Sequence, residues 1–379
     1  MKKILFVFGT RPEAVKMAPI ILELQKRKNV ELKICVSGQH RELLDSVLDV
    51  FRIKPDFDLN IMKHGQDLSD ISSRVMLGLR DVFKEFAADI VAVHGDTTTA
   101  FISALAAYYQ KIKVAHIEAG LRTNDIYSPF PEEGNRRMID AISSYLFAPT
   151  ERNEKTLLAE NIDKDKIFVV GNSVVDALFE MRKRINSSEN LQKDIVENIK
   201  NTGYSFDDKR KIVLITTHRR ENIGDNLGEI YKAIKILAES HKNCDFLIVL
   251  HPNPILAQTI EPIIGGTANI KILRDVDYYS FMYLMEKSYI IMTDSGGIQE
   301  EAPSFGAPVF ILRSATERPE GVECGVAKIL GADKDFIVSQ VSAVLRDENL
   351  RNSMSCKKSP YGDGNTSARI ADILTSDKS

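Results

Sequence analysis

Residues 4–17, ILFVFGTRPEAVKM, join a run of five apolar residues to a helical pattern through one short turn. The run Ile4–Phe8 is typical of a buried strand, and Ala14–Arg27 has its apolar residues at helical spacing. Gly9 permits a tight turn, and Pro12 suits the first turn of a helix. The segment therefore predicts a strand followed directly by a helix, which is the repeating unit of a parallel α/β sheet.

The same turn carries two cations, Arg11 and Lys16, beside the expected start of the helix. The backbone N–H groups of a helix start, together with basic side chains, favour an anion. The turn lacks the GxGxxG pattern of dinucleotide-binding proteins, because GTRPEA stands where that pattern would be needed. An ordinary strand–helix turn with solvated charges accounts for these residues equally well.

Strand and helix patterns alternate along most of the remaining chain. In the first half, further strands are expected at Leu32–Val36, Ile90–His94, Val114–Ile117 and Tyr145–Ala148. A second series is expected at Ile212–Thr216, Phe246–Leu250, Ile270–Leu273, Tyr289–Met292 and Pro308–Leu312. Near-continuous apolar strands indicate parallel sheets covered on both faces. The sequence thus predicts two doubly wound α/β domains, residues 1–170 and residues 171–360.

Composition narrows the classes of function. The chain has 379 residues, 44% hydrophobic and 27% charged, as is usual for soluble globular proteins. Lys plus Arg number 50 and Asp plus Glu 53, so a net charge of −3 gives no general attraction to nucleic acid or to an anionic membrane. The four scattered cysteines lack metal-ligand spacing, which favours a reduced, cytoplasmic protein without a metal. No apolar stretch is long enough to span a membrane, and the first one is too short for a signal peptide.

Two carboxylates of the first domain follow expected strands. Asp96 lies in HGDTTT, and Glu118 shares one strand face with His116 in HIEAGLR. Ionisable groups that leave a buried strand are costly unless they are paired or used in chemistry. Asp96 is also explained as a turn or helix-capping residue, and the pair His116 and Glu118 as ion-paired with Arg122.

A third carboxylate, Glu132, opens a helix in PFPEEGNRR. Glu132 and Arg136 are four residues apart, so we expect them on the same helix face. Acidic residues are common in a first helical turn for dipole reasons alone. Together with Asp96 and Glu118, however, Glu132 completes a set of three carboxylates suited to acid/base catalysis.

The most specific local pattern of the second domain is TDSGGIQEEAP, residues 293–303. A buried strand gives way to Ser-Gly-Gly and a helix, so backbone N–H groups are available to a phosphate. Glu301 lies about one turn further on, where a carboxylate accepts hydrogen bonds from ribose hydroxyls. A packed glycine turn is the alternative. His218 in THRREN and Arg318 in TERPE add groups that suit a phosphate.

These motifs together resemble the bacterial non-hydrolysing UDP-N-acetylglucosamine 2-epimerases. They run in order from Gly9 to about Gly364: GTRPEAVKMAP, GQHRELLD, VHGDTTTA, HIEAGLRT, SPFPEEGNRR, THRREN, MTDSGGIQEEAPS and TERPEG. The resemblance implies an α/β protein of the GT-B fold, with two Rossmann-like domains whose parallel sheets face a deep cleft. It also implies that a last helix, about residues 365–376, packs back on the first domain after the break PYGDG.

The resemblance further implies reversible interconversion of UDP-GlcNAc and UDP-ManNAc by a homodimer, without NAD or metal. The catalytic residues it implies are Arg11, Lys16, Asp96, Glu118, Glu132, Arg136 and His218. The UDP-binding residues it implies are Arg11, His218, Phe281, Ser295, Gly296, Gly297, Glu301 and Arg318. The expected role is in cell-surface polysaccharide synthesis, with no nucleic acid or membrane partner.

The chain departs from the family pattern at several positions. Val276 stands where a polar residue is expected to line the uracil pocket, and Cys324-Gly325-Val326 replaces Ala-Gly-Thr after TERPE. Some members carry a second, regulatory UDP-GlcNAc site. Its glutamines and arginine are replaced here by Glu42, Ser46 and Gly65, which argues against activation by substrate.

The reaction can be reasoned from its chemistry. The hydrogen on C2 of the sugar has no adjacent carbonyl, so a base cannot remove it directly. Loss of UDP from C1 makes that hydrogen acidic and gives a glycal, to which UDP adds back. We expect Asp96 and Glu132 near the C2 proton with Glu118 assisting, while the assignment of acid and base stays open. The alternatives are an epimerase of a related UDP-sugar, a hydrolysing epimerase, a GT-B glycosyltransferase and a non-catalytic sensor of nucleotide sugars.

Overall fold

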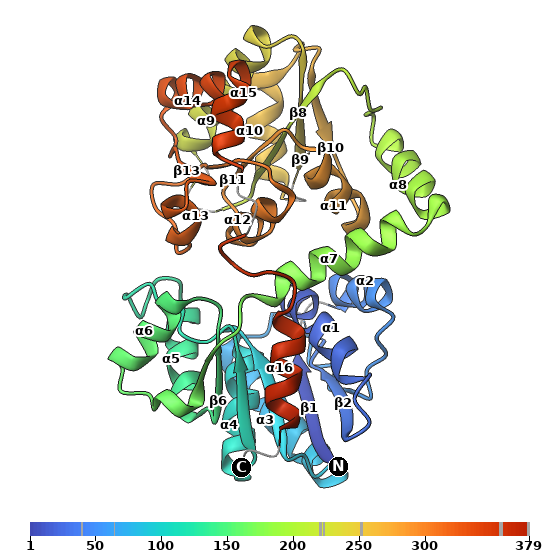
Figure 1. Cartoon of the computed structure of the whole chain (residues 1–379), viewed down its shortest axis with the longest axis vertical. Coiled ribbons are helices and arrows are strands. Elements are labelled where there is room, and N and C mark those ends of the chain that lie inside the picture. Colours follow the sequence, from blue (N-terminus) through green and yellow to red (C-terminus); the bar gives the residue numbers. More distant parts are fainter. Residues whose placement is uncertain are drawn as a thin grey trace. The chain divides into compact units, whose positions relative to one another are not determined.

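The computed structural model describes residues 1–38, 41–63, 65–219, 222, 224–250, 253–355 and 359–376, with the backbone alone for 41–43. The chain divides into two compact units. The first consists of Met1–Ala177 with Tyr361–Ser379, and the second of Leu178–Pro360. Each unit contains one sheet of parallel strands with helices packed on it (Figure 1).

The sheet of the first unit has the order β3-β2-β1-β4-β5-β6-β7. Its strands are β1 (Lys2–Phe8), β2 (Val30–Val36), β3 (Phe57–Asp58), β4 (Ile90–His94), β5 (Lys113–Ile117), β6 (Tyr145–Ala148) and β7 (Ile167–Val169). Its helices are α1 (Arg11–Leu24), α2 (Arg41–Phe51), α3 (Leu68–Glu85), α4 (Thr98–Tyr109), α5 (Glu132–Ile142), α6 (Glu151–Ala159) and α16 (Thr366–Thr375). Although α16 ends the described chain, it packs on α1 of this unit (Figure 1).

The sheet of the second unit has the order β10-β9-β8-β11-β12-β13. Its strands are β8 (Lys211–Thr217), β9 (Cys244–Leu250), β10 (Ile270–Leu273), β11 (Ile290–Thr293), β12 (Val309–Ile311) and β13 (Ala327–Ile329). Its helices are α8 (Glu189–Asn201), α9 (Asp225–Ser240), α10 (Pro254–Ile264), α11 (Tyr278–Lys287), α12 (Gly296–Glu301), α13 (Pro319–Glu323), α14 (Lys334–Arg346) and α15 (Glu348–Ser353). Helix α7 (Ser173–Asn186) carries the chain from one unit into the other.

The predicted strands are confirmed, and they form the centre of each sheet. All five runs of the first half and all five of the second half lie in strands, with ends displaced by a few residues. The short strands β3, β7 and β13 were not predicted, because two or three residues give no readable alternation. Helices α7 and α8 follow each other closely and are separate, because the Ser188 side chain accepts from the N–H of Leu191 and caps the start of α8.

Apolar burial explains why these sheets form. In the first unit, Leu5 and Val7 of β1 pack with Val91 and Val93 of β4 in one core cluster, under residues of α3 and α4. These strand side chains are fully buried. A strand buried on both faces must be apolar throughout, so polar groups gather where the strands end.

Candidate active site

Each sheet reverses its strand order at one place. In the first unit β1 lies between β2 and β4, and in the second unit β8 lies between β9 and β11. At such a place the loops after the two central strands diverge and leave room for a ligand at the carboxyl ends. We call the loops after β1 and β4, together with the neighbouring loop after β5, the first switch point, and the loops after β8 and β11 the second.

The turn after β1 is organised around Glu13, which is buried. Its carboxylate accepts hydrogen bonds from the backbone N–H groups of Gly9 and Thr10, at 3.0 and 2.8 Å. The hydroxyls of Thr10 and Thr97 donate to it as well, each at 2.8 Å. Burial raises the pKa of Glu13 above its ordinary value, although these donors oppose the rise. The sequence analysis missed this residue, although its place three residues after Thr10 is that of a helix capping box.

Lys16 and Glu118 meet at the first switch point. Lys16 Nζ forms an ion pair with Glu118 Oε2, and Asn172 Nδ2 donates to the same oxygen at 3.0 Å. His94 Nε2 lies 3.6 Å from it. Glu118 has a φ of +70°, a left-handed conformation that is unusual for a residue with a side chain. Strain of this kind is concentrated at functional sites.

Asp96 is held by residues of α5. Arg136 Nη2 pairs with Asp96 Oδ2, and Asn135 Nδ2 donates to the carbonyl oxygen of Asp96 at 2.8 Å. Glu132 and Arg136 lie four residues apart in α5 and therefore on the same helix face, as predicted, while Arg136 Nη1 lies 3.4 Å from Glu133 Oε2. In the described part of the chain, Glu132 Oε2 is buried without a hydrogen-bond partner. Such an oxygen is costly to bury, and it marks a position for a ligand group or a proton.

The alternative explanation of His116 and Glu118, an ion pair with Arg122, is wrong. Arg122 Nη2 lies 2.7 Å from Asp140 Oδ2 and hydrogen-bonds Glu160. The local spacing could not show this, because Asp140 comes from α5, eighteen positions further along the chain.

Asp294 organises the second switch point. This buried carboxylate accepts hydrogen bonds from the backbone N–H groups of His218 and Arg219 and from Asn222 Nδ2, at 2.9–3.1 Å. His218 Nδ1 lies 3.2 Å from Asp294 Oδ1. Burial by itself would raise the pKa of Asp294, but hydrogen bonds from His218, Arg219 and Asn222 hold it below its ordinary value. Asp294 therefore fixes the turn that presents His218.

Gly296 begins α12 directly under the guanidinium of Arg318. A Cβ on Gly296 would lie 2.8 Å from Arg318 Nη1, whereas one on Gly297 would meet nothing nearer than 3.8 Å. Arg318 Nε donates to Glu300 Oε1 at 2.9 Å. The structure thus pairs Arg318 with Glu300, and Glu301 is a separate, half-buried residue of the same helix.

The second switch point also contains donors that the sequence analysis missed. Arg219 Nε and Gln299 Nε2 are buried and have no hydrogen-bond partner in the described structure. Thr316 Oγ1 donates to Gln299 Oε1 at 2.5 Å, which leaves the amide nitrogen as the open group. Buried donors without partners favour an anionic or carbonyl ligand.

The other residues predicted to contact a ligand have defined positions in the structure, but their contacts with a ligand stay predictions. Phe281 and Val276 are partly buried against one core cluster of the second unit. Arg11 is the first residue of α1 and is half-buried. Of the regulatory positions, the side chain of Glu42 lies outside the described residues, as do Gln39 and His40 of the motif GQHRELLD.

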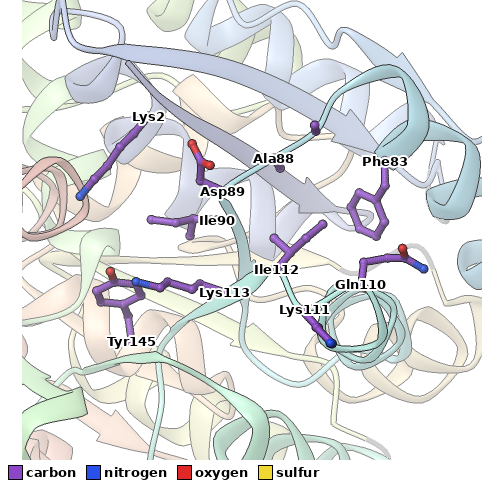
Figure 2. Close-up of a pocket in the computed structure, with 11 residues that line it drawn as sticks. Lys2, Phe83, Ala88, Asp89, Ile90, Gln110, Lys111, Ile112, Lys113 and Tyr145 are labelled. Atoms are coloured by element: carbon purple, nitrogen blue, oxygen red, sulfur yellow. The ribbon is translucent and has the colours of Figure 1, made fainter. Parts of the chain in front are cut away.

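A hollow of about 690 Å³ lies elsewhere in the first unit. Lys2, Asp89, Lys113 and Tyr145 line it, and each lies at or just before the start of a strand (Figure 2). It is therefore at the amino ends of the strands, at the edge of the sheet opposite the first switch point. This hollow has no share in the candidate active site.

Comparison with known proteins gives the chain a family. A sequence model of UDP-N-acetylglucosamine 2-epimerase matches residues 22–375. The chain belongs to the UDP-N-acetylglucosamine 2-epimerase family. It is 45% identical to the UDP-N-acetylglucosamine 2-epimerase of Campylobacter jejuni over 378 residues, which is 100% of this chain and 98% of that protein. The enzyme of that name from Escherichia coli K12 is 45% identical over 377 residues, 99% of each chain.

Solved structures agree with the assignment to the epimerase family. The UDP-GlcNAc 2-epimerase of Neisseria meningitidis, in its complex with UDP-GlcNAc, has a TM-score of 0.91 and 45% identity, covering 98% of this chain and 99% of that one. MurG of Acinetobacter baumannii has a TM-score of 0.60 at 12% identity, over 99% of each chain. MurG has the GT-B fold, and this likeness shows that the chain shares it. The predicted fold class and family are thus confirmed.

Two absences complete the description. In the part of the chain that the structure describes, no helix combines the length and apolarity needed to cross a membrane. Over the same residues, no group of three or more His, Cys, Asp or Glu side chains could hold a metal ion.

Proposed function

We propose that this protein is a non-hydrolysing UDP-N-acetylglucosamine 2-epimerase, which interconverts UDP-GlcNAc and UDP-ManNAc. The observation that carries the proposal is the set of three carboxylates around the first switch point, each in a different environment. Asp96 is paired with Arg136, Glu118 with Lys16, and Glu132 keeps one oxygen without a partner. Full-length likeness to enzymes of that name supports it.

The proposed reaction is an elimination followed by an addition. The bond from C1 to the UDP oxygen breaks and its electron pair leaves with UDP, while a base takes the C2 proton and the C2–H electrons form the C1=C2 bond of 2-acetamidoglucal. UDP then adds back to C1 as C2 receives a proton on the opposite face. No electrons are gained or lost overall, so the route requires no redox cofactor.

The carboxylates are proposed to act at C2 and C1. Asp96 and Glu132 exchange the C2 proton, and Glu118 offsets the positive charge that develops at C1 as UDP departs. Lys16 and Arg136 hold Glu118 and Asp96 in position through their ion pairs. A carboxylate oxygen without a donor, such as Glu132 Oε2, is free to meet a substrate hydrogen.

The second unit is proposed to bind the UDP moiety. Within it, the diphosphate is assigned to His218, the Ser295–Gly297 turn and Arg318, the ribose to Glu301 and the uracil to Phe281. Arg11 of the first unit is proposed to contribute to binding of the diphosphate. The unpartnered donors Arg219 Nε and Gln299 Nε2 fit an anion in the same place. Stabilising the diphosphate as it leaves is a large part of the catalysis that this route needs.

The wider setting is part of the same proposal. We expect a cytoplasmic homodimer that works without metal or other cofactor and serves synthesis of a cell-surface polysaccharide. Size-exclusion chromatography with light scattering and assays after chelator treatment test the dimer and the independence from metal.

Proton NMR of the protein with UDP-GlcNAc in D2O, without an acceptor, tests the function. The expected result is UDP-ManNAc with deuterium at C2. Free ManNAc with UDP would instead indicate a hydrolysing epimerase. An unchanged spectrum from folded protein would contradict the proposed substrate, and turnover that needs an added acceptor would indicate a glycosyltransferase.

A further inference from the structure

A buried charged cluster lies beside the first switch point and takes no part in the chemistry proposed above. His116 on β5 is fully buried, with Nδ1 2.6 Å from Asp140 Oδ1 and Nε2 2.7 Å from the carbonyl oxygen of Gly95. Arg122 bridges Asp140 to Glu160. The groups that face His116 and its partner thus come from the loop after β4, the loop after β5, from α5 and from the end of α6.

The hydrogen bonds determine the protonation of the ring. A carbonyl oxygen can only accept, so Nε2 of His116 must donate to Gly95. Asp140 also accepts from the N–H of Gly120 at 3.2 Å and from Arg122 at 2.7 Å, as an ionised carboxylate does. Burial by itself would raise the pKa of Asp140, but His116 and Arg122 hold it below its ordinary value. With Asp140 ionised, Nδ1 of His116 donates to Oδ1 as well, so this set of hydrogen bonds favours an imidazolium.

This pair touches the backbone of both loops that carry the proposed catalytic carboxylates. Gly95, which His116 holds, immediately precedes Asp96 and has a φ of +64°. Gly120, which Asp140 holds, follows Glu118 by two residues and has a φ of +84°. A Cβ on Gly120 would lie 2.5 Å from the carbonyl oxygen of Asn153, so the chain passes very close to α6 here. Glycine adopts these left-handed conformations readily, so the two hydrogen bonds from the pair hold turns that the backbone can form without strain.

We propose that His116, kept as an imidazolium by Asp140, is a positioning residue that sets the places of Asp96 and Glu118 for the epimerase reaction. It does not touch the substrate. The inference rests on the proposed function. Misplacement of a reacting group by about 1 Å costs up to about 100-fold in rate.

The protonation is tested first, by long-range ¹H–¹⁵N spectra of the histidine rings at about pH 8, where an unperturbed histidine is mostly neutral. His116 should have protons on both ring nitrogens. His241 is the internal control, because it is buried against the hydroxyl of Ser342 at 3.0 Å and burial lowers its pKa. His241 should show one bare nitrogen. A bare nitrogen on His116 would overturn the proposal, whether or not the protein is an epimerase.

The positioning role is tested with His116→Gln alone and with His116→Gln combined with Asp140→Asn. In the single variant the amide nitrogen can still donate to Gly95, but the amide oxygen faces the Asp140 carboxylate and repels it. We expect kcat to fall at least about 10-fold with little change in KM. In the double variant the asparagine amide donates to the glutamine oxygen, so most of kcat should return. A purely structural loss of packing would not be repaired by a second substitution.

His241→Gln is the matched control, since it also removes a buried histidine hydrogen bond but lies in the second unit away from either switch point. A kcat of His116→Gln equal to that of His241→Gln would overturn the proposal, as would a double variant no better than the single one. If His116→Gln does not fold, the double variant and the ring spectra carry the test. A wild-type protein inactive on UDP-GlcNAc would instead refute the proposed function. The spectra of the histidine rings test the protonation of His116 independently of that result.

Discussion

The two switch points hold their central carboxylates in different ways. At the first, Asp96 and Glu118 are each paired with the end of a long side chain, Arg136 or Lys16. At the second, Asp294 is enclosed by two backbone N–H groups and an asparagine amide. Side-chain partners can be exchanged for a ligand or a proton, whereas backbone donors cannot move away without unfolding the turn.

The difference indicates a division of labour. Carboxylates with exchangeable partners suit proton transfer, and on α5 one oxygen of Glu132 is buried without a hydrogen-bond partner in the described structure. The oxygens of Asp294 accept hydrogen bonds from the protein itself and hold the turn in place. Donors near it, such as Arg219 Nε, have no hydrogen-bond partner in the described structure and suit an anion. The first switch point is thus suited to proton transfer, and the second to binding an anionic ligand.

Glu118→Gln should have the largest effect, because the amide keeps the shape but loses the charge that Lys16 neutralises and that is proposed to stabilise C1 as UDP leaves. We expect kcat to fall by at least about 100-fold with the fold retained. Initial rates of UDP-ManNAc formation and circular dichroism measure this. Asp81→Asn, an exposed carboxylate paired with Lys84 at 3.0 Å, is the control and should change neither. A Glu118→Gln variant with wild-type kcat would remove the first switch point from the chemistry.

Asp294→Asn should impair binding and stability rather than the chemical step. The amide places N–H groups against backbone donors, so we expect a loss of about 1–3 kcal/mol of stability and about a tenfold rise in KM. Urea unfolding and steady-state kinetics measure the two quantities. A fall in kcat without a rise in KM would contradict the inference that the turn held by Asp294 serves substrate binding.

The same variant has a predicted pH dependence. The pKa of Asp294 is lower in the folded than in the unfolded protein, so its charge stabilises the fold above the unfolded value of about 4. That contribution is lost as the pH falls through this range towards the folded pKa. The stability difference between wild type and Asp294→Asn should therefore shrink below about pH 4.

Gly296→Ala should lower stability by about 1–2 kcal/mol, because the new methyl group displaces the Arg318 guanidinium from Glu300. Gly297→Ala, one residue along the same helix, gains only ordinary contacts and should not destabilise the ligand-free protein. Thermal unfolding of both variants without substrate makes the comparison. Equal melting temperatures would show that Arg318 is not held against Gly296.

Thr97→Val should have the smallest effect. Thr97 accepts from the N–H of Ala100 at 3.0 Å as the cap of α4 and donates to Glu13. Its loss should cost about 1 kcal/mol of stability and little kcat, because Glu13 keeps its other donors. Ser188→Ala, which removes the cap of α8, is the matched control for stability. A large loss of kcat would show that the remaining donors to Glu13 are not sufficient to hold the turn after β1 in its active conformation.

The sequence predicted the sheets well because strands buried on both faces must be apolar. It also placed Asp96, Glu118 and His218 after strands, where the structure has them. It could not predict that Asn172 reaches Glu118, because fifty-four positions separate them and no local pattern connects them. Asp294 was visible in the motif, but its role depends on backbone N–H groups of another strand's loop. Contacts made by the fold itself are the part that sequence patterns do not contain.

In the proposed reaction, the bond between C1 and UDP breaks and re-forms in each turnover. UDP-GlcNAc labelled with ¹⁸O in the bridging position between C1 and the β-phosphate tests this directly. The label should move into non-bridging positions of the β-phosphate as UDP-ManNAc accumulates, because released UDP can rotate before it adds back. Epimerisation with the label fixed in the bridge would contradict the elimination route and the roles assigned to both switch points.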